Sequence, residues 1–246
     1  MVTRGGLLIA IAVGFGITGC ASGGTSTGGT ATGGGAGDVT NLLTQGQRER
    51  ETDNTRAAAD ALESAYDAND PAQAQQLFQQ ALQSAEAAIA EDTLNPLAYR
   101  LAGEANMGLE NYMEAGEQLD RATELRPLYE LELAGAREQA YIDLYMEASP
   151  LLDQGQYLEA AEVLEEANAI YPDRPEALIT LAQIYAQERQ HDRAIAAIDS
   201  AMAFLESDAM EGVDQETAAG WREQGQDLPL LRAQVLADAG RFEEAV

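Results

Sequence analysis

A spacing pattern of small and apolar residues recurs along this chain at a fixed interval and limits what the chain can fold into. Its clearest copy consists of Tyr157, Ala160, Leu164, Ala167 and Pro172. An upstream copy runs from Tyr112 to Pro127, and a downstream copy begins at His191, 34 residues after Tyr157. Repeats of this length stack into a solenoid, because each unit buries its apolar face only against its neighbours.

The spacing within each copy is that of one face of an α-helix. Residues three and four apart share a face, so Ala160, Leu164 and Ala167 form a stripe. Alanines let two helices approach closely, and the larger leucine fills the groove between them. A proline further on ends the helix, since it lacks an N–H group. Another helical pattern precedes each stripe, as in residues 178–185 ahead of His191. The pattern therefore predicts antiparallel helix pairs.

These positions resemble the tetratricopeptide repeat family, because several of them agree in register across the copies over residues 96–127 and 144–206. The resemblance implies an all-α solenoid with three repeats, over residues 96–127, 141–172 and 175–206. We predict that the whole helical repeat domain occupies residues 38–246. It would begin with a degenerate helix pair over residues 55–91.

The spacing begins again near the carboxyl end, where Gly240 and Phe242 match the start of the earlier copies. This predicts an incomplete repeat over residues 227–246. Solenoids normally end in a polar cap. Either the chain continues in a longer protein, or a partner covers the face that the missing helix would leave exposed.

Two insertions interrupt the period. Residues 128–141 are apolar and favour helix, which predicts one long first helix that continues to residue 152. Pro150 near its end is a candidate kink. Residues 207–226 contain three glycines and the only tryptophan, so we predict a loop there with a short helix over 215–223.

The amino terminus has the layout of a secretory signal peptide. Arg4 supplies the positive charge, residues 7–17 form a short apolar run, and Gly19 is a small residue ahead of a cleavage point. The run is too short to span a membrane as a helix. We therefore predict a signal peptide over residues 1–19.

Cys20 follows that run and is the only cysteine of the chain, so it can form no internal disulfide. Ile17, Thr18 and Gly19 before it resemble a bacterial lipobox. The resemblance implies that a diacylglycerol is attached to the thiol and that the new amino terminus is acylated, as with palmitate. By resemblance to lipoproteins of two-membraned bacteria, the non-acidic Ala21 and Ser22 behind the cysteine favour the outer membrane, facing the periplasm, as the location. The alternative is a free cysteine behind an ordinary signal peptide.

The stretch behind Cys20 is built almost wholly from glycine, serine, threonine and alanine up to residue 37. Such a composition cannot bury enough apolar surface to fold, so residues 20–37 are predicted to be a disordered tether. As a flexible coil it would reach on the order of 20–25 Å. Several acyl chains at its start would anchor the chain firmly to a membrane.

The chain is strongly acidic, with 42 acidic residues against 14 basic ones, all arginine, and a formal net charge of −28. This balance argues against nucleic-acid binding and against polybasic contact with anionic lipids. Two interpretations remain, a docking surface for a basic partner or adaptation of the surface to high salt. The spread of acids over every predicted helix and the absence of lysine favour the second.

No residues with the spacing of an active site stand out. His191 is the only histidine, and it occupies the position of Tyr112 and Tyr157 in the other copies, which indicates packing. A metal site would need further histidine or cysteine ligands, and neither a calcium loop nor a phosphate-binding glycine loop occurs. We therefore predict no catalytic residues, no metal and no cofactor.

The resemblance to tetratricopeptide repeats implies that the first helices of the pairs line a concave groove. The inward positions would be Leu97, Arg100, Glu104, Met107, Ile142, Tyr145, Ser149, Ile179, Gln183 and Gln187. They lack the lysine, arginine and asparagine cluster with which some family members grip a terminal carboxylate. The groove and the expected lipid anchor together lead us to predict a membrane-anchored scaffold or adaptor for other envelope proteins or peptides. The alternative is a periplasmic module that binds peptides or glycan fragments in this groove.

Overall fold

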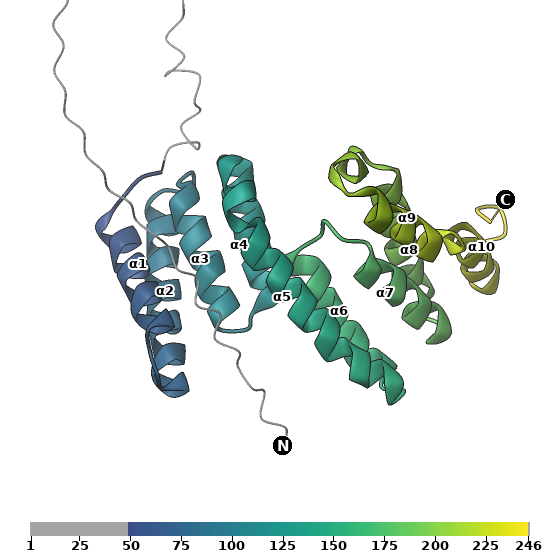
Figure 1. Ribbon diagram of the computed structural model, residues 1–246, viewed down its shortest axis with the longest axis horizontal. Coiled ribbons are helices and arrows are strands. Elements are labelled where there is room, and N and C mark those ends of the chain that lie inside the picture. The colour runs from purple at the N-terminus through teal and green to yellow at the C-terminus, as the bar shows by residue number, and fades with distance from the viewer. Residues whose placement is uncertain (1–48, 246) are drawn as a thin grey trace, which may run out of the picture.

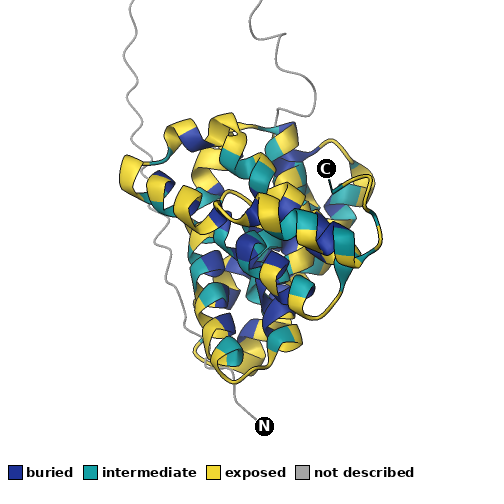
Figure 2. Ribbon diagram, turned by 90° about the vertical axis from the view of Figure 1, so that its right-hand side faces the viewer, coloured by how far each residue is buried: buried dark blue, intermediate teal, exposed yellow. Residues whose placement is uncertain are grey.

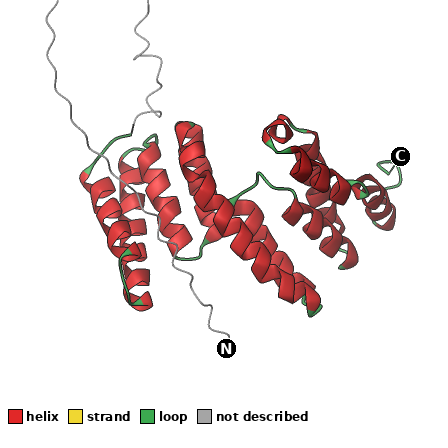
Figure 3. Ribbon diagram, viewed as in Figure 1, coloured by secondary structure: helices red, strands yellow, loops and turns green. Residues whose placement is uncertain are grey.

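The computed structural model describes residues 49–245, in which helices lie side by side in chain order along the long axis (Figure 1). Short loops join them, and no strand occurs in this part of the chain (Figure 3). The predicted all-α solenoid is therefore confirmed. The signal peptide, the Ile17, Thr18, Gly19 and Cys20 motif and the tether lie outside the described residues. Between residues 49 and 245 no helix is both long and apolar enough to cross a bilayer.

Four antiparallel pairs form most of the array. Their helices are α1 (Asp53–Tyr66) with α2 (Pro71–Glu91), α3 (Pro96–Gly108) with α4 (Tyr112–Leu125), α5 (Leu128–Asp153) with α6 (Tyr157–Ile170), and α7 (Glu176–Gln187) with α8 (His191–Glu206). A 3₁₀ turn, η3 (Asp208–Gly212), and helices α9 (Gln215–Gly225) and α10 (Leu228–Asp238) follow. The helix pair expected over residues 55–91 corresponds to α1 and α2.

The stripes that define the repeat lie in the core. Their buried residues, each 0% exposed, are Ala115, Leu119, Ala122, Ala160, Leu164, Ala167, Ala194, Ile198 and Ala201. Figure 2 shows that buried residues lie on the facing sides of the helices and exposed ones on the outside. The small side chains thus occupy the helix crossings, as the spacing predicted.

The turns after α3, α5, α7 and α10 share one backbone conformation. In each, a residue with positive φ follows the helix, namely Glu110, Gly155, Arg189 and Gly240. The next N–H group donates to a carbonyl five residues back, as in Gln190 to Tyr185 at 2.8 Å. This is the Schellman motif, in which glycine is favoured because it has no Cβ. Two of the four turns therefore keep a residue poorly suited to the conformation.

We expect replacement of Arg189 by glycine to raise the free energy of unfolding by about 1 kcal/mol. Arg189 has φ 57°, a left-handed conformation that costs an L-residue about 1–2 kcal/mol. Urea denaturation would measure the change. Arg189→Ala is the matched control, because it removes the same side chain but keeps the Cβ. If both variants had the same stability, relief of backbone strain could not be the cause.

The two insertions fold as helices. The long first helix predicted from residues 128–141 is confirmed, since α5 extends through Pro150, which lies in its last turn. The second insertion contains α9, close to the expected short helix, and also η3, which was not expected. Trp221 of α9 is 6% exposed and packs edge-on against Phe204 of α8, with ring centroids 5.8 Å apart.

The core consists of two main clusters. One joins α1 and α2 to Leu101, Ala102 and Ala105 of α3, and the other extends from α4 to α10. Between the pairs, α4 packs more closely on α6 than on α5. At this crossing Gly116 of α4 faces the backbone of Ala169 in α6.

A buried arginine also joins the middle helices. Arg137 of α5 is 8% exposed, and its Nε donates to the carbonyl of Ile170 at the end of α6 at 2.6 Å. Its guanidinium pairs with Asp120 of α4, also at 2.6 Å. One side chain of α5 therefore links α4 and α6.

Candidate partner-binding surface

The residues predicted to bind a partner lie on α3, α5 and α7, and we call this set the inner-helix surface. On α3, Arg100 pairs with Glu104 at 2.9 Å and reaches Glu132 of α5 at 3.5 Å. Leu97 and Met107 of α3 are half-buried. The Arg100 contact with Glu132 links α3 to the first part of α5, ahead of Ile142.

Tyr129 in the first turn of α5 lies between two arginines. The Arg100 guanidinium carbon is 5.3 Å from the ring centroid, and that of Arg126 is 5.0 Å from it. The ring is 0% exposed, and its hydroxyl donates to Glu49 at 2.6 Å. Burial and this carboxylate raise the pKa of Tyr129, so the hydroxyl remains a hydrogen-bond donor at neutral pH.

A second cluster joins α5 to α7. Tyr141 and Tyr145 of α5 stack with centroids 6.0 Å apart, and the Tyr145 hydroxyl lies 3.5 Å from the hydroxyl of Thr180. Arg174, in the loop before α7, lies 5.2 Å from the Tyr141 centroid and pairs with Glu176 at 2.7 Å. Side-chain contacts therefore link α5 to α3 near its first turn and to α7 further along.

The sequence analysis missed the arginines that organise these clusters. Arg126 and Arg174 both precede a proline at the start of a first helix, in Arg126-Pro127 and Arg174-Pro175. In each case the guanidinium packs over a tyrosine of α5. The shared Arg-Pro dipeptide, with its proline directly ahead of α5 and of α7, was the available signal.

One predicted residue must be removed from the surface. Ile179 is 4% exposed and packs in the core, because apolar residues cover almost every side of α7. Its neighbour Thr180 contacts Tyr145 instead. Among the other predicted residues, Ile142 and Tyr145 are half-buried, whereas Ser149, Gln183 and Gln187 are exposed.

Glu104 has an unusual electrostatic environment. Burial raises the pKa of its carboxyl group, and the ion pair with Arg100 opposes this without cancelling it. The folded state therefore binds a proton at Glu104 more readily than the unfolded chain does. The stabilisation from that proton is fully present below the ordinary glutamate pKa and is lost as pH rises through the raised pKa.

We accordingly expect Glu104→Gln to keep or raise the free energy of unfolding at neutral pH, because glutamine has the same shape without the buried charge. The difference from the unsubstituted protein should shrink as pH falls through the raised pKa, where Glu104 becomes neutral too. Urea denaturation across a pH series would measure this. A loss of stability at neutral pH that grew with pH would show that the Arg100 pair outweighs burial.

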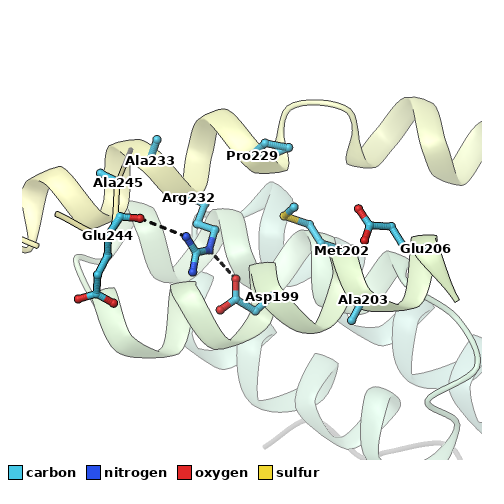
Figure 4. A pocket seen from close by; sticks show the side chains of 9 residues that line it. All are labelled: Asp199, Met202, Ala203, Glu206, Pro229, Arg232, Ala233, Glu244 and Ala245. Carbon is cyan, nitrogen blue, oxygen red and sulfur yellow. Dashed lines mark hydrogen bonds and ion pairs between the residues drawn. The ribbon is translucent and has the colours of Figure 1, made fainter. Parts of the chain in front are cut away.

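Two hollows of the molecule lie towards the carboxyl end. One of about 550 Å³ lies between α8 and α10, where Arg232 pairs with Asp199 at 2.6 Å (Figure 4). Another of about 310 Å³ includes Gln183 of the inner-helix surface and Leu228 of α10. Both are open and shallow compared with an enclosed active site. No group of three or more metal-ligating residues occurs within residues 49–245.

Residues 151–210 match the family model described as tetratricopeptide repeat. This segment contains α6, α7 and α8, including the clearest copy of the spacing pattern. It is thus assigned to a repeat class of protein-interaction modules that are generally not catalytic. No match to the chain was found among curated proteins.

Several solved structures are similar over much of the chain. A crystal structure of MamA is 16% identical, covering 69% of this chain and 83% of its own, with a TM-score of 0.34. MamA from residue 41 to the end, from Desulfovibrio magneticus RS-1, is 18% identical, covering 80% and 98%, with a TM-score of 0.26. YrrB, described as "a TPR protein with an unusual peptide-binding site", is 17% identical, covering 78% and 98%, with a TM-score of 0.25. Likeness at this level gives no information about what this chain binds.

Proposed function

We propose that this chain is a lipid-anchored scaffold that binds other proteins or peptides of a bacterial cell envelope through its inner-helix surface. The observation that carries the proposal is the row of first helices α3, α5 and α7, which side-chain contacts link, in a chain with a segment that matches an interaction repeat. The surface offers a half-buried aromatic residue on α5, Tyr145, and an exposed amide on α7, Gln183. Such a mixture of apolar and polar groups is suited to peptide contact.

The inner-helix surface can be tested by crosslinking the full chain in its native envelope and identifying the captured proteins. We expect the double variant Arg100→Ala, Tyr145→Ala to lose most of the crosslinked product. The control is Arg121→Ala, Met146→Ala, which removes an arginine and a large apolar side chain outside the set. Equal yields from both variants would exclude the inner-helix surface as the binding site. Capture of small peptides or glycans in place of proteins would favour a ligand-binding module.

The proposed anchor rests on the sequence around Cys20 and has its own test. In a Cys20→Ser variant, we expect loss of labelling by a fatty-acid analogue and movement of the protein from the membrane fraction to the soluble fraction. An unchanged membrane fraction would contradict lipid anchoring at this residue. The outcome is separate from that of the surface test, because the repeats lie elsewhere in the chain.

We further propose that the acidic surface is an adaptation to high salt. Circular dichroism across a salt series would test it, since screening by ions should relieve repulsion among the excess carboxylates. We expect helix content or thermal stability to rise with salt concentration. Full helix content and unchanged stability at very low salt would leave a docking surface for a basic partner as the better interpretation.

A further inference from the structure

The short segment ahead of α1 is bound by residues far from it in the chain. Arg50 donates its backbone N–H to Oδ1 of Asn95 at 3.2 Å, and Nδ2 of Asn95 donates to the carbonyl of Arg50 at 2.8 Å. A single side-chain amide thus engages both main-chain groups of one residue. Such a contact recognises an extended backbone whatever side chain it carries.

Asn95 is held in place for this role. It is 0% exposed, and the oxygen that accepts from Arg50 also accepts from the backbone N–H of Leu97 at 3.2 Å, where it caps α3. This second bond fixes which end of the amide is the oxygen. The orientation of Asn95 is therefore set by α3 and does not depend on the bound segment.

Both side chains of the segment, those of Glu49 and Arg50, contact residues of opposite charge. The Glu49 carboxylate pairs with Arg126 at 2.7 Å and accepts from the Tyr129 hydroxyl at 2.6 Å, while the Arg50 guanidinium pairs with Asp92. Arg126 and Tyr129 thus form a site for an acidic side chain, and Asp92 forms one for the basic side chain that follows it. Such complementary charges give an interface its specificity.

The contacts of Asn95, Asp92, Arg126 and Tyr129 with Glu49 and Arg50, which we call the clamp, stand out in a chain of net charge −28, because Arg100 and Arg126 flank the same tyrosine ring. Arg126 supplies the positive charge that contacts the Glu49 carboxylate, whereas Arg100 is also paired with Glu104. Glu49 makes these contacts although its side chain remains 37% exposed, so the site lies at the surface of the molecule.

We propose that Asn95, Asp92, Arg126 and Tyr129 form a binding site for an extended peptide with an acidic residue followed by a basic one. Glu49 and Arg50 of the same chain are its occupant and close it to other peptides. The inference is independent of the envelope role, since it rests on these contacts alone. Thr52 caps α1 and so keeps the neighbouring Glu49 and Arg50 close to the site, which gives the segment a very high effective concentration. A free peptide therefore cannot compete until the segment is displaced.

A fluorescent peptide with the sequence of residues 47–52 and the full chain provide the test. The substitution Glu49→Arg sets a positive side chain against Arg126, so we expect the segment to be released from the site. The variant should then bind the peptide at least about tenfold more tightly than the unsubstituted chain does. Adding Arg126→Gln should weaken that binding about tenfold again. Glu51→Arg is the matched control, because the same charge reversal beside the clamp should leave the site closed. Fluorescence anisotropy measures all four proteins.

Hydrogen exchange at the Arg50 amide gives a second readout, which we expect to be at least about tenfold faster in Glu49→Arg than in Glu51→Arg. Absence of peptide binding to Glu49→Arg would overturn the site, and equal binding by the unsubstituted chain would overturn its closure. A dimer of the unsubstituted chain that Glu49→Arg dissociates would show that a second copy supplies the occupant, contrary to the proposal. Circular dichroism confirms that each variant is folded.

Discussion

Replacing Gly116 by alanine is expected to lower the free energy of unfolding by about 3 kcal/mol, despite the better helix propensity of alanine. A Cβ at this position would lie 2.2 Å from the carbonyl oxygen of Ala169, far inside van der Waals contact. Backbone cannot yield as a flexible side chain does, so α4 and α6 would have to move apart. Urea denaturation followed by circular dichroism would measure the loss.

Gly135 of α5 is the matched control for this substitution. A Cβ there would meet nothing within 4 Å, so Gly135→Ala should stabilise the protein by about 0.5–1 kcal/mol through helix propensity alone. The two alanine variants should therefore shift stability in opposite directions. Similar effects from both would show that the α4–α6 crossing is not tightly packed in solution.

The second large effect is expected for Leu164→Ala. Leu164 is 0% exposed at the centre of α6, and its truncation should cost about 3 kcal/mol or more, because the rigid helices around it cannot close the cavity. Leu158→Ala on the same helix is the control, since Leu158 is 42% exposed and should change stability by less than about 1 kcal/mol. Thermal unfolding would compare the two. A small loss at Leu164 would mean that the array relaxes around the cavity.

Local spacing was sufficient to predict the helix pairs. Ala160, Leu164 and Ala167 bury the same helix face whatever lies further along the chain, and the 34-residue interval repeats that arrangement. The long α5 was also predictable, because residues 128–141 contain no proline and, apart from Gly135, consist mainly of residues that favour helix. These features depend on contacts within a repeat or between adjacent repeats, which periodicity records directly.

Contacts between distant segments left no such signal. Asn95 and Arg50 are 45 residues apart, and Tyr129 and Glu49 are 80 apart, so no period relates them. The surface assignment of Ile179 was wrong for a different reason. Apolar residues surround α7, and the helical period alone cannot show which of them faces solvent.

The contacts of Glu49 and Arg50 have a mechanical consequence. A pulling force on the chain ahead of Glu49 would act first on Arg126 and Asn95, which belong to the starts of α5 and α3. The load would thus enter at the starts of α3 and α5 and at Asp92, which caps the end of α2, and α1 would feel it only after these contacts had ruptured. The first helix of the solenoid, which has neighbours on one side only, would in this way be shielded from being peeled away.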